Sequence, residues 1–194
     1  MTVGMVPFGQ AARKALSLAH QEAVRLDHVK IGPGHILLGL IRDEGDVGKI
    51  LNEQGANPND VRRIVVSQTP ASEKAGTQPG SVDLLHTTQR MLERAVEVTR
   101  EKNHGSIDCE HLLLALVELE DGRTKDILAA AGLDRDTIRE YINQRMHATQ
   151  SLAELDELLD TLEASRRSLE AEFGTAHEER LRKIEAILRE YFGQ

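Results

Sequence analysis

Two stretches of the sequence match each other at a separation of 76 residues. Eight positions agree within a window of 25 residues: Leu16 and Leu92, Ala19 and Ala95, His28 and His104, Ile31 and Ile107, His35 and His111, Leu37 and Leu113, Leu38 and Leu114, and Leu40 and Leu116. Further along the chain the separation becomes 77, as at Gly55 and Gly132, which one residue added in a surface loop would explain. A repeat this long that occurs twice predicts a duplicated unit, because a solenoid needs three or more units.

Each unit has the apolar spacing of four helices. In the first unit, apolar residues recur every three or four positions from about Gln10 to Leu26, which predicts one amphipathic helix. Pro33 suits the first turn of a second helix, and Gly55 can end a third in the left-handed conformation. The fourth helix should begin at Pro58. The predicted fold class is therefore all-α, with two pseudo-symmetric four-helix repeats.

The same pattern sets the expected domain boundaries. Repeat 1 should span about residues 8–66 and repeat 2 about residues 84–147, which together form a domain at residues 1–147. Residues 67–83 are rich in Pro, Gly, Ser and Thr and show no periodicity, so we expect a linker there.

Residues 148–194 have a different pattern, which predicts a C-terminal helical hairpin. Capping boxes begin at Ser151 and Thr175, with Gly174 between two apolar stretches. The expected helices span about residues 152–173 and 176–192. Because so small a hairpin is marginal alone, its apolar stripe should pack on the rest of the chain or on a second hairpin, and we favour a homodimer.

The charge balance excludes several classes of partner. The chain has 24 basic and 32 acidic residues, a formal charge of -8 and a pI near 5.5. This balance argues against nucleic acid and anionic membranes as partners. A single cysteine excludes an internal disulfide, and the N-terminus lacks the basic start and the apolar run of a signal peptide. We therefore expect a cytoplasmic protein.

Few residues suggest enzymatic chemistry. The sequence has no phosphate-binding loop, since the Gly48-Lys49 pair is followed by isoleucine and not by a hydroxyl residue, so ATP hydrolysis is not expected. Cys109, near His111, could act as a nucleophile, but we favour a small buried hydrophobic role for it. We predict that the protein is not an enzyme, and we keep a small helical enzyme using Cys109 and His111 as a third alternative.

The repeated histidines invite a metal-site interpretation. The histidines of each unit, His28 with His35 and His104 with His111, do not have the i, i+4 spacing that shares a helix face. We favour hydrogen-bonded histidines at helix starts, with no metal and no cofactor.

The repeat is most specific over residues 27–40 and 103–116, where each copy holds two histidines followed by leucines. Together with Phe8 and the helix after it, this doubled motif resembles the N-terminal domain of Clp/Hsp100 unfoldases, closest to the ClpC type. The resemblance covers about residues 5–146. The ATPase modules that normally follow are not in this sequence, so the resemblance implies a free-standing N-domain.

The resemblance also implies candidate sites. ClpC-type N-domains bind phosphorylated arginine through a glutamate just before each motif histidine. Glu110 is present at the second position and could pair with a guanidinium, whereas Gly34 replaces the first glutamate. The family's threonine before the glutamate is replaced by Pro33 and Cys109. Glu110 could instead be a helix N-terminal acid that interacts with the helix dipole.

A second trait of the resemblance concerns the start of the chain. In actinobacterial ClpC-type proteins, antibiotic cyclic peptides bind the N-domain on an apolar surface beside the first helix. The corresponding residues here are Met5, Val6, Phe8, Lys14 and Leu18. Phe8 could alternatively staple the first helix to the core.

These features favour a non-enzymatic binding protein. The leading hypothesis is a decoy or sequestering receptor for ClpC N-domain ligands, namely cyclic peptides, adaptors or tagged substrates, that modulates Clp proteolysis. The alternative is an adaptor that delivers substrates to a Clp unfoldase-protease.

Overall fold

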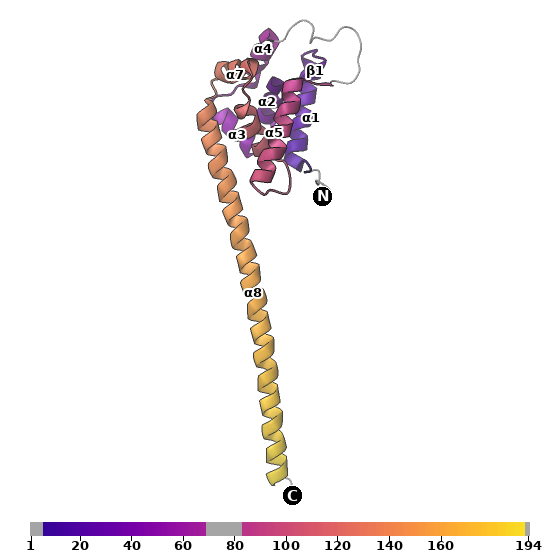
Figure 1. Cartoon of the computed structure of the whole chain (residues 1–194), viewed down its shortest axis with the longest axis vertical. Coiled ribbons are helices and arrows are strands. Elements are labelled where there is room, and N and C mark those ends of the chain that lie inside the picture. The colour runs from indigo at the N-terminus through magenta and orange to yellow at the C-terminus, as the bar shows by residue number, and fades with distance from the viewer. Residues whose placement is uncertain (1–5, 69–82, 193–194) are drawn as a thin grey trace. The chain divides into compact units, whose positions relative to one another are not determined.

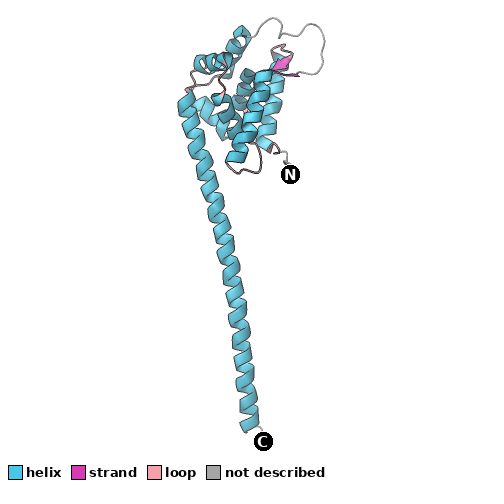
Figure 2. Ribbon diagram, viewed as in Figure 1, coloured by secondary structure: helices cyan, strands magenta, loops and turns pink. Residues whose placement is uncertain are grey.

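The structure is a computed structural model that describes residues 6–68 and 83–192. Within them the chain is almost entirely helical, with one small pair of strands (Figure 2). Repeat 1 contains α1 (Gln10–Arg25), α2 (Pro33–Arg42), α3 (Asp46–Glu53) and α4 (Pro58–Gln68). Repeat 2 contains α5 (His86–Glu101), α6 (Cys109–Glu118), α7 (Gly122–Ala130) and the first part of α8 (Arg135–Phe192). The predicted all-α class and the four helices of each repeat are confirmed.

The chain divides into two compact units, residues 1–146 and 147–194. Residues 69–82 of the predicted linker lie outside the described residues. None of the described helices combines the length and the apolar character that a membrane crossing requires.

Left-handed backbone occurs at equivalent points of the two repeats. Gly55 and Gly132 have φ angles of 93° and 73° after α3 and α7, as the sequence predicts for helix-ending glycines. Asp27 and Asn103 follow α1 and α5 with φ angles of 58° and 55°. Asp and Asn tolerate this conformation better than most residues do. The duplication therefore extends to the backbone of the turns.

Helices α2 and α6 supply the centre of the core. The leucines of both helices are nearly fully buried, as are the alanines on the inner face of α1. α1 approaches α2 closely at Gly39, where an added Cβ would lie 2.2 Å from the carbonyl oxygen of Ala15. The small residues of α1 and Gly39 thus let the two backbones pack together.

Two short parallel backbone pairings, which the sequence analysis did not predict, join the repeats. β1 (Lys30–Ile31) pairs with β2 (Asp83–Leu84), so that Ile31 lies beside Leu84. Phe8 forms an isolated bridge with Ile107. The two pairings are related by the 76-residue shift. They escape prediction because two residues are too few to show a strand period.

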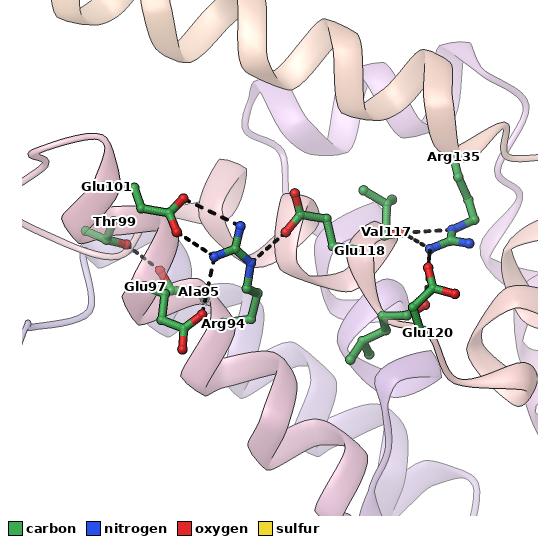
Figure 3. Close-up of polar contacts among 10 residues, drawn as sticks. Arg94, Ala95, Glu97, Thr99, Glu101, Val117, Glu118, Glu120 and Arg135 are labelled. Atoms are coloured by element: carbon green, nitrogen blue, oxygen red, sulfur yellow. Dashed lines mark hydrogen bonds and ion pairs between the residues drawn. The ribbon is translucent and has the colours of Figure 1, made fainter.

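Buried and half-buried ion pairs tie the helices of each repeat together. In repeat 1, the fully buried Glu22 of α1 binds Arg42 of α2 at 2.7 Å and Arg62 of α4 at 2.6 Å. In repeat 2, Arg94 of α5 binds Glu118 of α6 at 2.7 Å, beside a second ion pair with Glu101 (Figure 3).

Helix α8 corrects the prediction for the C-terminal segment. It runs without interruption from Arg135 to Phe192, so the predicted hairpin is wrong and the turn at Gly174 is absent (Figure 1). A glycine inside a helix costs only about 1 kcal/mol relative to alanine, which its neighbours can offset. The Ser151 hydroxyl donates to the carbonyl of His147 at 3.1 Å, as serines do within helices, instead of capping a new one.

Candidate functional site

The motif histidines form one hydrogen-bonded pair in each repeat. In repeat 1, the Gly32 N–H donates to Nδ1 of His35 at 2.9 Å, so Nε2 of His35 carries the proton and donates to Nδ1 of His28 at 2.8 Å. In repeat 2, His111 and His104 repeat this arrangement at 2.8 Å. Both ring nitrogens of His35, and likewise both of His111, are therefore hydrogen-bonded. These bonds hold each ring at the start of its helix, α2 or α6. We call His35 and His111 the inner histidines.

Burial holds these inner histidines neutral. Burial first, and the neighbouring His28 second, lower the pKa of His35 to about 4. Burial and His104 likewise lower the pKa of His111 to about 4. Among residues 6–68 and 83–192, no group of three or more His, Cys, Asp and Glu side chains is placed to hold a metal ion. The predicted hydrogen bonds of the histidines are confirmed, with His35 and His111 in the first turns of α2 and α6 and with His28 and His104 in the turns after α1 and α5.

A cavity of about 210 Å³ opens at the start of α2, beside Gly34. A Cβ added to Gly34 would lie 2.7 Å from Cγ2 of Val65 and 3.1 Å from Cδ1 of Ile127. Because residue 34 is glycine, repeat 1 has no carboxylate at this position, and Val65 of α4 and Ile127 of α7 lie where a Cβ would be.

Glu110 lies at the equivalent position of repeat 2, in the first turn of α6, with 23% of its side chain exposed. Its Oε1 is 3.3 Å from Nε of Arg145 in α8, and the same guanidinium pairs with Asp46 of α3. Arg145 is also the main cause of the lowered pKa of Asp46. Glu110 is thus a first-turn acid, as one sequence interpretation expects, and its carboxylate pairs with a guanidinium of its own chain.

Phe8 lies where backbone hydrogen bonds hold the start of the chain against repeat 2. The Gly9 N–H donates to the carbonyl of Ile107 at 2.9 Å, and the Ile107 N–H donates to the carbonyl of Pro7 at 2.8 Å. The Phe8 ring is half-buried and packs against the core. This position supports the staple interpretation and still leaves part of the ring exposed to a ligand.

The other predicted residues of this surface differ in exposure. Val6 packs partly buried against the core, Leu18 is half-buried, and Lys14 is 53% exposed. Met5 lies outside the described residues. Hereafter the N-terminal face means Val6, Phe8, Lys14 and Leu18.

Asp43 connects the N-terminal face to the start of α6. Its carboxylate is 5% exposed and binds Nζ of Lys14 at 3.2 Å. The Gly45 N–H donates to it at 3.2 Å, and Sγ of Cys109 lies 4.0 Å away. Asp43 therefore contacts Lys14 of α1 and lies near Cys109, the residue before Glu110.

Cys109 does not have the environment of a nucleophile. It is 3% exposed, and burial, followed by the negative charge of Asp43, raises its pKa to about 12. Exposure and a lowered pKa are the two conditions for a reactive thiol, and Cys109 meets neither. The preferred interpretation of a small buried residue therefore fits the structure.

Asp43 and Arg145 were not among the residues predicted from the sequence. The repeat does contain a signal for Asp43. The 76-residue shift aligns it with Leu119, so a charged residue stands where the other repeat has an apolar residue, which is buried. Arg145 gave no such signal, since it lies 35 positions from Glu110 and 99 from Asp46.

Comparison with known proteins gives a consistent family match. A family model described as the Clp repeat (R) N-terminal domain matches residues 7–101 and 83–182. Chaperone protein ClpB of Oceanobacillus iheyensis is 31% identical over 148 residues, which cover 75% of this chain and 18% of that protein. The negative regulator of genetic competence ClpC/MecB of Bacillus subtilis is 28% identical over 145 residues, which cover 74% of this chain and 18% of that protein. The chain thus spans less than a fifth of the length of these relatives.

Solved structures show the same fold. The N-terminal domain of the chaperone ClpD from Arabidopsis thaliana superposes with a TM-score of 0.60 and 24% identity, covering 72% of this chain and 96% of that one. The Hsp104 N-terminal domain from Candida albicans has a TM-score of 0.57 and 23% identity, covering 70% of this chain and 89% of that one.

Proposed function

Because the chain belongs to the family of Clp repeat (R) N-terminal domains, we propose that it is a binding module for peptide or protein ligands of Clp N-domains. In this proposal it is a decoy receptor, which holds cyclic peptides, adaptors or tagged substrates and so keeps them from a ClpC-type unfoldase. A cytoplasmic location, where such ligands would be met, belongs to the same proposal.

The observation that most supports this proposal is the N-terminal face, which we propose as the ligand-binding surface. Hydrogen bonds of Pro7 and Gly9 with Ile107 hold the backbone around Phe8, and an ion pair with the buried Asp43 holds Lys14. A surface held in place before binding loses little conformational entropy when a ligand arrives. The face therefore offers a partly exposed aromatic ring and a cation on a rigid support.

A thermal shift assay tests ligand binding. A cyclic peptide directed at ClpC N-domains should raise the melting temperature, with a stabilisation of about 2.7 kcal/mol at a hundredfold excess over the dissociation constant. Phe8→Ala should weaken the shift. Leu84→Ala is the matched control, because Leu84 pairs with Ile31 as Phe8 pairs with Ile107. Equal weakening by both variants would show that only general destabilisation is involved.

A second assay separates a decoy from an adaptor. Added in excess, the protein should protect a ClpC-type unfoldase from the peptide in proportion to the fraction of peptide bound. Such protection requires no contact with the unfoldase. If the protein instead binds the unfoldase and stimulates its ATPase, the adaptor alternative replaces the decoy.

A further inference from the structure

The second unit carries a row of exposed apolar side chains along α8. Every side chain that the structure describes between residues 147 and 186 is exposed. Seven large apolar residues of this segment are between 48% and 65% exposed: Leu155, Leu158, Leu159, Leu162, Leu169, Leu181 and Ile184. Helices in water gain most of their stability from packing an apolar face, so this row requires a partner.

We infer that the partner is a second copy of this chain, and that the two α8 segments pair as an antiparallel two-stranded coiled coil. The spacing of four and three residues from Leu155 to Leu162 is that of a heptad seam, and Leu181 and Ile184 each lie one residue past the positions where this heptad recurs, so the seam shifts by one residue between the two halves. When Leu162 is placed opposite Leu181 of the second copy, Leu159 falls opposite Ile184 of that copy. These two layers therefore pair apolar side chains from both copies, whereas Leu169 falls opposite Gly174.

The charge distribution selects the antiparallel orientation. Residues 152–172 hold seven acidic and two basic residues, whereas residues 173–192 hold four of each. A parallel pair would place the two halves of charge -5 side by side. An antiparallel pair places each of them beside a neutral half, which lowers the repulsion.

Arg166 supports the same orientation. It interrupts the leucine row, is 70% exposed and pairs with Glu170 at 3.8 Å. In a parallel pair, Arg166 would face Arg166 of the second copy within the seam. In the antiparallel register the two arginines lie in different layers, so two like charges do not meet.

The continuity of α8 explains why the partner is a separate chain. A hairpin folded near residue 171 would bring the same leucine pairs together within one copy. Because α8 continues through Gly174, these pairs can form only between two copies. The exchange of identical elements between copies is a low-cost route to a dimer.

Light scattering on the full chain tests the association. We expect a dimer, and a monomer would overturn the inference. Leu162→Asp should raise the dissociation constant of the dimer by at least about a hundredfold, because each dimer then buries two carboxylates and loses two leucines. Ala164→Asp is the matched control, since Ala164 lies off the row, and it should remain dimeric. If Leu162→Asp also stays dimeric, the row is not the interface.

Disulfide cross-linking tests the orientation. A mixture of Leu162→Cys and Leu181→Cys chains should give mixed cross-linked dimers, whereas Leu162→Cys alone should give none. The native Cys109 does not compete, because it is buried. Cross-linking of Leu162→Cys with itself would indicate a parallel pair and overturn the proposed orientation. Gly174→Ala should strengthen the dimer by favouring the continuous helix, and a weaker dimer would indicate that a turn is needed at Gly174.

Discussion

At the scale of single residues, position 34 distinguishes repeat 1 from repeat 2, which has Glu110 at the equivalent place. Gly34 is buried, and its Cβ position is already filled by Val65 and Ile127. Gly34→Glu should therefore lower the free energy of unfolding, by about 1–3 kcal/mol for overpacking alone, and should create no arginine-phosphate site. Urea denaturation measures the first effect and calorimetry with a phosphoarginine peptide measures the second.

Gly105→Glu provides the control for this substitution. An added Cβ at Gly105 meets no atom within 4 Å, and the residue is exposed. The free energy of unfolding of the Gly105→Glu variant should stay within about 0.5 kcal/mol of that of the unsubstituted protein. If Gly34→Glu were as stable as this control and bound the peptide, the filled-site explanation would be incorrect.

The lowered pKa values of His35 and His111 predict how the free energy of unfolding depends on pH. The folded pKa of His35 and of His111 is about 4, below the ordinary value of 6.5. The unfolded chain therefore binds protons that the folded chain does not, and stability is lost as the pH falls from 6.5 toward 4. At 1.36 kcal/mol per pKa unit, the loss is about 3 kcal/mol for each histidine.

Glu22 should add a separate loss at lower pH, because its hydrogen bond to Arg62 lowers its pKa below 4.5. Urea midpoints measured across this range should thus fall in two stages. NMR of the imidazole rings identifies the groups, and ring signals of His35 or His111 that titrate near pH 6.5 would contradict the assignment of the first stage.

At the scale of helices, Glu22 joins α1 to α2 and α4 through ion pairs with a fully buried carboxylate. It is fully buried and binds Arg42 and Arg62. Glu22→Ala should cost about 3–5 kcal/mol, because it leaves the arginines without their buried partner. Glu101→Ala is the control, since Glu101 pairs with Arg94 but is 57% exposed, and it should cost less than about 1 kcal/mol. Equal losses in urea denaturation would show that burial is not the deciding factor.

Helix periodicity and helix-ending residues predicted the helices of repeat 1 to within a few residues, because both signals act locally. Gly55 is an example, since its left-handed backbone follows from its place after an apolar stripe. The same reasoning gave a wrong prediction at Gly174, where the helix continues. A local signal does not indicate whether a glycine ends a helix or is tolerated within it. The candidate site could not be predicted in this way, because it depends on contacts between residues far apart in the sequence, such as Asp43 with Lys14. Helix periodicity does not indicate which distant residues meet.

At the scale of the whole molecule, the two repeats share a fold but differ in the residue that precedes the inner motif histidine, His35 or His111. Gly34 and Glu110 are equivalent, and only Glu110 offers a carboxylate. Any arginine-phosphate binding should therefore use one site per chain and be abolished by Glu110→Ala. Calorimetry gives the stoichiometry directly, and two equivalent sites would contradict the prediction.

The native partner of Glu110 limits this site. A ligand guanidinium must displace Arg145, which binds both Glu110 and Asp46. Arg145→Gln should therefore tighten binding of a phosphoarginine peptide by at least about tenfold, since a hydrogen bond to a charged group contributes about 1.5–3 kcal/mol. Arg139→Gln is the matched control, because Arg139 lies on the same helix and pairs with Asp136. If both variants leave the affinity unchanged while Glu110→Ala abolishes binding, Arg145 does not compete with the ligand. If Arg145→Gln weakens binding, the arginine supports the bound phosphate and does not occupy its site.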